Sequence, residues 1–140
     1  MPSQGGKAFQ MTHSGGAYMP VESPDGAAVY FCHKSPEKGV WSVPVEGGQS
    51  QPVTGPYKGP LCGLAVTRQG LYYTASGSSS EQSAILFKSF AGGKVDPVVT
   101  SDRSIGVLAL SVSPDERYLT YGQADRSGSD LMIVENFAAR

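Results

Sequence analysis

The stretch SPDG at residues 23–26 decides the expected fold, because its counterparts recur along the chain. TRQG at residues 67–70 begins 44 residues later, and SPDE at residues 113–116 begins 46 residues after that. In SPDG, proline presets its own φ near about −65°, aspartate can bond neighbouring backbone amides, and glycine supplies a left-handed residue. The pattern therefore predicts a tight turn between two strands, repeated three times.

Two other landmarks repeat with nearly the same spacing. One is an apolar run, and the other is a pair of glycines that leads into a short segment ending in threonine. The runs occupy residues 40–45, 85–90 and 131–137, and the glycine-led segments occupy residues 5–12, 47–54 and 92–100. Three landmarks with one period indicate internal repetition rather than chance.

A period of about 40–50 residues built from strands is typical of propeller blades. We expect an all-β fold of three four-stranded antiparallel blades, formed by residues 15–56, 57–101 and 102–140. The first strand of each blade is expected to line the axis of the ring. The expected strands are residues 17–22, 28–33, 40–45 and 49–54, then 61–66, 71–75, 84–90 and 95–100, then 107–112, 118–123 and 131–137.

The third repeat ends after its third strand, and the N-terminal stretch supplies a match for the missing fourth. Residues 7–12 follow a glycine pair and end in threonine, as the other fourth strands do. Known rings have about 4–8 blades, so three blades cannot close one. We expect the chain to form half of a six-bladed propeller in a two-fold homodimer, with residues 1–14 completing the partner's last blade. The rival interpretation is a fragment of a longer propeller.

These motifs resemble TolB-like, WD-type propeller repeats over nearly the whole chain, and specifically the C-terminal three blades of a bacterial TolB-like propeller. Residues 111–137, SVSPDERYLTYGQADRSGSDLMIVENF, are similar to the closing blade of that family. The resemblance implies a scaffold for protein contacts with no catalytic residues. Residues 67–69 and Glu116 depart from the family's turn pattern, so the second blade is expected to be degenerate.

Composition and charge exclude several classes of protein. Lys plus Arg number 11 against 12 for Asp plus Glu, a net charge of −1, which gives no signature of nucleic-acid binding. Gly (18) and Pro (10) make up one fifth of the chain, which disfavours a helical bundle. No stretch approaches the roughly 20 apolar residues of a membrane span. Residues 1–16 are polar and do not form a signal peptide, so the chain as it stands is expected to be cytoplasmic.

We expect no catalytic, cofactor-binding or metal-binding residues, and hence no enzyme. The sequence contains neither a G-x-S-x-G nucleophile elbow nor the spacing of a phosphate-binding loop. His13 and His33 lie on different expected strands and are expected to be structural or solvent-facing. Cys32 and Cys62 lie in no metal-ligand motif; two buried thiols are favoured, and a disulfide stays open.

The singled-out residues have structural or contact roles. Pro24, Asp25 and Gly26 are expected to form the first turn, and Pro114 and Asp115 its counterpart in the third repeat. The candidates for contacts in an axial channel are Tyr18, Met19 and Glu22.

The expected function is a non-enzymatic module for assembly and protein–protein recognition, with a second copy and a protein partner. The alternatives are a small-ligand-binding sensor domain of a larger bacterial regulator and a propeller domain detached from an enzyme.

Overall fold

The computed structural model describes residues 5–13, 15–34, 38–56, 63–76, 83–125 and 128–135, and all regular structure within them is β. This confirms the all-β class. The strands are β1 (Ala17–Glu22), β2 (Ala28–His33), β3 (Gly39–Pro44), β4 (Gln51–Pro52), β5 (Leu64–Val66), β6 (Gly70–Ser76), β7 (Ser83–Ser89), β8 (Val95–Ser101), β9 (Ile105–Val112), β10 (Tyr118–Asp125) and β11 (Gly128–Glu135). The described residues include no helix long and apolar enough to cross a membrane.

The strands form three antiparallel sheets, each made of strands that follow one another in the chain. The orders are β1-β2-β3-β4, β5-β6-β7-β8 and β9-β10-β11, and we refer to these sheets as blades 1, 2 and 3. Short connections between consecutive strands favour this arrangement, because neighbouring antiparallel strands need only a tight turn. Blade 3 contains three strands among the described residues, as the third repeat predicts.

The fourth strand of blade 1 is shorter than expected. Residues 49–54 were expected to be extended and paired, but β4 contains only Gln51 and Pro52. Gly47 and Gly48, with φ of 90° and 130°, turn the chain before it. Pro52 has no N–H to donate, which limits how far a ladder can continue.

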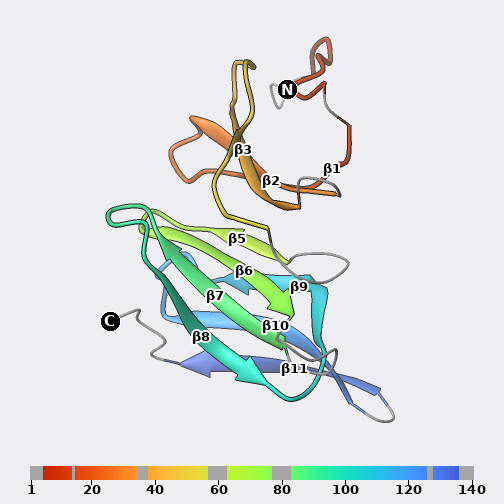
Figure 1. Cartoon of the computed structure of the whole chain (residues 1–140), viewed down its shortest axis with the longest axis vertical. Coiled ribbons are helices and arrows are strands. Elements are labelled where there is room, and N and C mark those ends of the chain that lie inside the picture. The colour runs from red at the N-terminus through yellow and green to blue at the C-terminus, as the bar shows by residue number, and fades with distance from the viewer. Residues whose placement is uncertain are drawn as a thin grey trace.

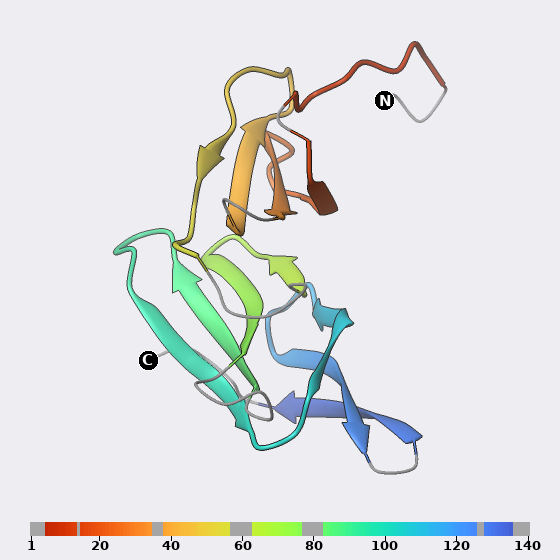
Figure 2. The same cartoon turned by 45° about the vertical axis from the view of Figure 1, so that its right-hand side comes forward.

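The blades are stacked face to face with blade 2 in the middle (Figures 1 and 2). The first strands lie together, because β1 contacts β5 and β5 contacts β9. In both views the N-terminal segment lies at the blade 1 end of the molecule and β11 lies at the opposite end.

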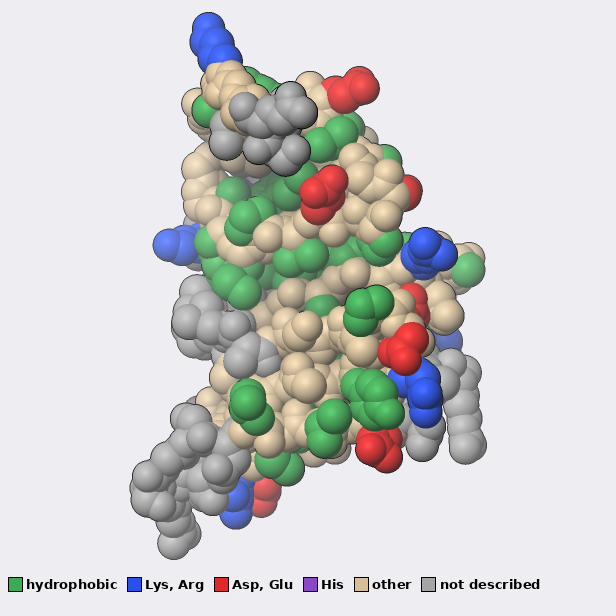
Figure 3. Space-filling model, turned by 180° about the vertical axis from the view of Figure 1, so that it is seen from behind, with side chains coloured by type: hydrophobic (Ala, Val, Ile, Leu, Met, Phe, Trp, Pro, Cys, Tyr) green, Lys and Arg blue, Asp and Glu red, His purple; other side chains and the backbone are tan. Residues whose placement is uncertain are grey.

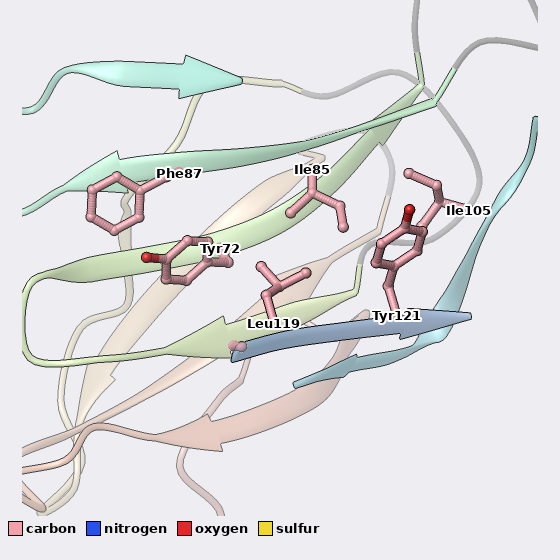
Figure 4. Packing of buried hydrophobic residues seen from close by; sticks show 7 residues of the cluster. Tyr72, Ile85, Phe87, Ile105, Leu119 and Tyr121 are labelled. Atoms are coloured by element: carbon pink, nitrogen blue, oxygen red, sulfur yellow. The ribbon is translucent and has the colours of Figure 1, made fainter. Parts of the chain in front are cut away.

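A hydrophobic cluster fills each space between neighbouring blades. Figure 4 shows side chains from β6 and β7 pointing toward side chains from β9 and β10, which joins blades 2 and 3. The labelled members are Tyr72, Ile85, Phe87, Ile105, Leu119 and Tyr121. A second cluster joins blades 1 and 2 through Cys32, Val40, Leu64, Leu71 and Tyr73. Burying apolar area in this way stabilises the stack by about 25 cal/mol per Å².

Candidate functional site

The third strands of the three blades occupy equivalent positions, which the strand registers establish. Trp41, Leu86 and Met132 share one repeat position, and each pairs with an aromatic residue of the preceding strand. Those partners are Phe31, Tyr73 and Tyr121, respectively. One position before each lies a residue on the opposite face of its sheet, because strand side chains alternate. The residues at that preceding position are Val40, Ile85 and Leu131. In blades 1 and 2 they point toward the following blade.

The residues at this next-blade position differ sharply in exposure. Val40 of blade 1 and Ile85 of blade 2 are each 0% exposed, because the following blade covers them. Leu131 of blade 3 is 82% exposed, and Ile133 on the same face is 59% exposed. The sequence analysis did not single out these two residues. Their place in the apolar run of the third repeat, equivalent to that of Val40 and Ile85, could have identified them. We call Leu131 and Ile133 the open face of blade 3.

Blade 1 carries aromatic side chains on the face turned away from blade 2. Phe31 and Trp41 are paired across β2 and β3 and lie on the side opposite Cys32 and Val40. Phe31 is buried and Trp41 is half-buried. The outward side of blade 1 is therefore largely covered within the chain, with Phe31 2% exposed, whereas blade 3 ends the stack in an exposed aliphatic face.

The two Ser-Pro-Asp turns share one hydrogen-bond pattern. In blade 1, the Ser23 hydroxyl donates to Asp25 Oδ1 at 2.6 Å, and the Ala27 N–H donates to the same oxygen at 3.0 Å. In blade 3, Ser113 and Arg117 donate to Asp115 in the same way. These bonds, the serine bond first, lower the pKa of the Asp25 and Asp115 carboxyl groups. Both carboxylates therefore serve the turns, where the structure also places Pro24 and Pro114.

The turn of blade 2 is built differently from the other two. The N–H of Thr67 donates to the carbonyl of Gly70, three positions ahead, at 2.9 Å. The N–H groups of Ser23 and Ser113 instead donate to carbonyls five positions ahead. Thr67 therefore occupies the structural position of Ser23. Gly70 does not occupy the position of Gly26, because it is already the first residue of β6. Blade 2 closes with a shorter turn. Its first strand, β5, contains 3 residues against 6 in β1 and 8 in β9, whereas β6, β7 and β8 contain 7 each.

The three turns gather at one end of the stack around a shallow hollow. A cavity of about 470 Å³ is lined by Pro24, residues 66–69 and residues 112–116. Arg68 faces this hollow together with Asp115 and Glu116, so both signs of charge are present. Figure 3 likewise shows acidic and basic side chains interspersed on the face it presents. The hollow offers a mixed polar contact surface.

Residues proposed for an axial channel lie on β1, the first strand of blade 1. Tyr18 and Met19 are half-buried and pack against the cluster between blades 1 and 2. Met19 has a φ of 54° within an irregular stretch of the β1–β2 pairing. Glu22 is exposed at the end of the strand. Their contact with a ligand stays a prediction.

The histidine and cysteine positions have structural surroundings. His33 is buried, with Nδ1 at 2.9 Å from the Lys34 carbonyl and its ring 5.5 Å from that of Trp41. His13 is exposed. Cys32 is buried and disulfide-bonded, so the expectation of a thiol there is wrong. The other cysteine of the chain, Cys62, lies outside the described residues. The described residues contain no cluster of three or more His, Cys, Asp or Glu side chains that could hold a metal ion.

Comparison of the structure with solved proteins settles the fold. TolB from Acinetobacter baumannii superimposes with a TM-score of 0.65 at 15% identity, over 83% of this chain and 29% of that one. This chain has the TolB-like β-propeller fold. An oligogalacturonate lyase in complex with manganese also matches this fold, with a TM-score of 0.65 at 16% identity, over 85% of this chain and 33% of the lyase.

The chain thus spans about a third of each of these propeller proteins. At such identities the likeness shows the TolB-like fold alone. No family model matches the sequence. No curated protein matches it either.

Proposed function

We propose that this chain is a non-enzymatic propeller module for assembly and protein–protein recognition, and that two copies form a six-bladed ring. The open face of blade 3 carries this proposal. Leu131 is 82% exposed at a position where Val40 and Ile85 are completely covered by the next blade. A blade placed there would remove Leu131 and Ile133 from water in the same way.

The surface area of the chain supports the proposal. The accessible surface is 8848 Å². A compact monomer of 14.7 kDa has about 6,900 Å² by the usual scaling with mass. The excess of about 1,900 Å² indicates that the chain is less compact than a typical monomer of its mass.

A two-fold ring would cover the open face of blade 3 in each copy. The open face of blade 3 in one copy would pack on the outward side of blade 1 in the other, where Trp41 is half-buried. The symmetry axis repeats the contact, so each copy uses both of its end faces. The turn end of the ring, with Arg68 beside Asp115, would then present the surface for a protein partner.

The disulfide at Cys32 bears on where such a module would work. Structural disulfides persist in oxidising compartments and are rare in the cytosol. Cys32 therefore supports an oxidising compartment as the site of action, in place of the expected cytoplasmic location.

The molar mass in solution tests the assembly. Light scattering during size exclusion is expected to give about 29 kDa, twice the 14.7 kDa of one chain. Leu131→Asp should raise the dimer Kd at least about 100-fold, because each of two interfaces loses about 1.5–3 kcal/mol of apolar burial. A soluble 14.7 kDa monomer at micromolar concentration would contradict the ring.

A matched control separates the open face from general surface hydrophobicity. Val95 on β8 is also an exposed aliphatic residue, at 43%, but it lies on the outer strand of blade 2. Val95→Asp should leave the dimer mass unchanged. An equal loss of dimer in both variants would show that the effect is not specific to blade 3.

A further inference from the structure

We propose that residues 5–12 of a second copy add to the free edge of β11 as the fourth strand of blade 3. This inference rests on the proposed two-copy ring and assigns its strand exchange. Each copy would give its N-terminal segment and receive that of its partner.

The acceptor is the outer edge of β11. Within the described part of the chain, β11 pairs with β10 on one side and with no strand on the other. An unpaired edge presents a row of N–H and C=O groups that can bind a further strand. Leu131, Met132 and Ile133 are all exposed along it. In blades 1 and 2 the corresponding edge is occupied by β4 and β8.

The donor segment carries the pattern of those fourth strands. Gly5 and Gly6 lead into residues 7–12 as Gly47–Gly48 and Gly92–Gly93 lead into β4 and β8. The ring of Phe9, 60% exposed, comes within 4.0 Å of the place a Cβ on Gly47 would occupy, so the segment passes over the β3–β4 turn of its own blade 1.

The two complete blades fix the register of the exchanged strand. In both blades, the residue four positions after the second glycine of the pair lies opposite the repeat position held by Trp41, Leu86 and Met132. These pairs are Trp41–Pro52 and Leu86–Pro97. The residue before it pairs one position further on, as Ser42–Gln51 and Phe87–Asp96. The same count places Gln10 opposite Met132 and Phe9 opposite Ile133. Phe9 would then cover one of the two exposed residues of the open face.

The terminal threonine strengthens this register. In blade 1, the Val40 N–H donates to the Thr54 side-chain oxygen at 2.9 Å, and the Thr54 N–H donates to the Val40 carbonyl at 3.1 Å. Thr12 holds the same position in its segment as Thr54, and Leu131 holds the same position as Val40. Thr12 of the partner would therefore satisfy both backbone groups of Leu131.

Chain length explains why the acceptor belongs to a second copy. Four residues separate Thr12 from the start of β1 at Ala17, and five Cα steps reach at most about 18 Å. The far side of blade 3 in the same chain lies beyond blade 2, and stacked sheets are about 10 Å apart, so the direct path alone exceeds about 20 Å. In a two-fold ring the partner's blade 3 is the immediate neighbour of blade 1, about one spacing away.

Engineered cysteine pairs test the exchange and its register. Gln10→Cys with Met132→Cys, after mild oxidation, is expected to give a covalent dimer of about 29 kDa on a non-reducing gel. Each single variant should give none. Gln10→Cys with Ala91→Cys is the matched control, because Ala91 lies on the exposed β7–β8 turn of blade 2. Phe9→Cys with Ile133→Cys tests the same register independently if the first pair folds poorly.

The outcomes separate this inference from the proposed function. Covalent dimer in the two matched pairs but not in the controls supports the exchange. A dimer by light scattering without cross-linking overturns the exchange and leaves the ring standing. A cross-link that forms within a 14.7 kDa monomer also overturns it. A wild-type monomer overturns both proposals.

Discussion

Glu116 shows how a single residue departs from the repeat at a conformational cost. Its φ is 56°, and in blade 1 the equivalent position is held by Gly26 with a φ of 71°. Left-handed backbone costs about 1–2 kcal/mol for residues that carry a Cβ and little for glycine. Glu116→Gly is therefore expected to raise the free energy of unfolding by about 1 kcal/mol, measured by urea denaturation.

The reverse change at Gly26 provides the matched comparison. Gly26→Ala should lower the free energy of unfolding by about 1 kcal/mol, because alanine would adopt a left-handed φ there. A Cβ would also approach Glu22 Oε1 at 3.3 Å, the end of a flexible side chain that can move away. Equal effects of the same sign in the two variants would show that φ does not control these turns.

Tyr72 is expected to make the free energy of unfolding depend on pH in the alkaline range. Burial, together with the nearby charge of Glu116, raises the pKa of Tyr72 to about 12. The unfolded chain loses this proton near pH 10, while the folded chain keeps it until about pH 12. The unfolded state therefore binds fewer protons in that window, and the free energy of unfolding should fall as pH rises from 10 to 12.

Tyr72→Phe tests this dependence. The variant should lose less stability than the wild type between pH 9 and pH 11 in urea denaturation. The two proteins are compared by how much their free energy of unfolding changes with pH, because the loss of the hydroxyl group itself shifts that free energy by a constant amount. Tyr73 and Tyr30 shift in the same direction through burial, so a residual decline is expected. Identical pH slopes for the variant and the wild type would contradict the assignment to Tyr72.

At the scale of elements, blade 2 shows how a changed turn preserves a blade. Thr67 closes the turn by accepting from Gln69 and Gly70 N–H groups at 3.3 Å and donating to the Gly70 carbonyl at 3.1 Å. These bonds replace the aspartate bonds of the other turns. The blade was expected to be degenerate. Its turn differs and β5 contains only 3 residues, but β6, β7 and β8 each contain 7.

Gly70 is required by the close approach of β6 and β7. A Cβ there would overlap the backbone carbonyl of Lys88 and lie 2.7 Å from the ring of Phe87. Gly70→Ala should lower the free energy of unfolding by about 2–3 kcal/mol, because the obstructing group is backbone and cannot rotate away. Gly92→Ala is the control and should change stability by less than about 0.5 kcal/mol, since nothing lies within 4 Å of its Cβ position. Similar losses in both variants would contradict the steric argument.

At the scale of the whole molecule, the described residues form a stack that ends at blade 3 with an exposed apolar face. The interior spaces are closed by two clusters that contain residues from all three blades. The same side-chain positions that fill those spaces stand in water at Leu131 and Ile133. Continuing the repeat by one more blade would account for this difference, and in the proposed ring a second copy would supply that blade.

The sequence by itself determined the all-β class, the three-fold repetition and most strand positions, because strand alternation and turn chemistry are local properties. The expected bounds of β1 and β2 match the structure, residues 17–22 and 28–33. It also gave Asp25 and Asp115 their places in the turns.

Only the tertiary structure decided which repeat positions are covered. Val40, Ile85 and Leu131 are equivalent apolar residues in sequence, and their exposure depends on whether another blade stands beside them. The shorter turn at Thr67 and the bonded state of Cys32 also required coordinates. Burial and long-range pairing arise between segments far apart in the chain, and local sequence patterns do not specify them.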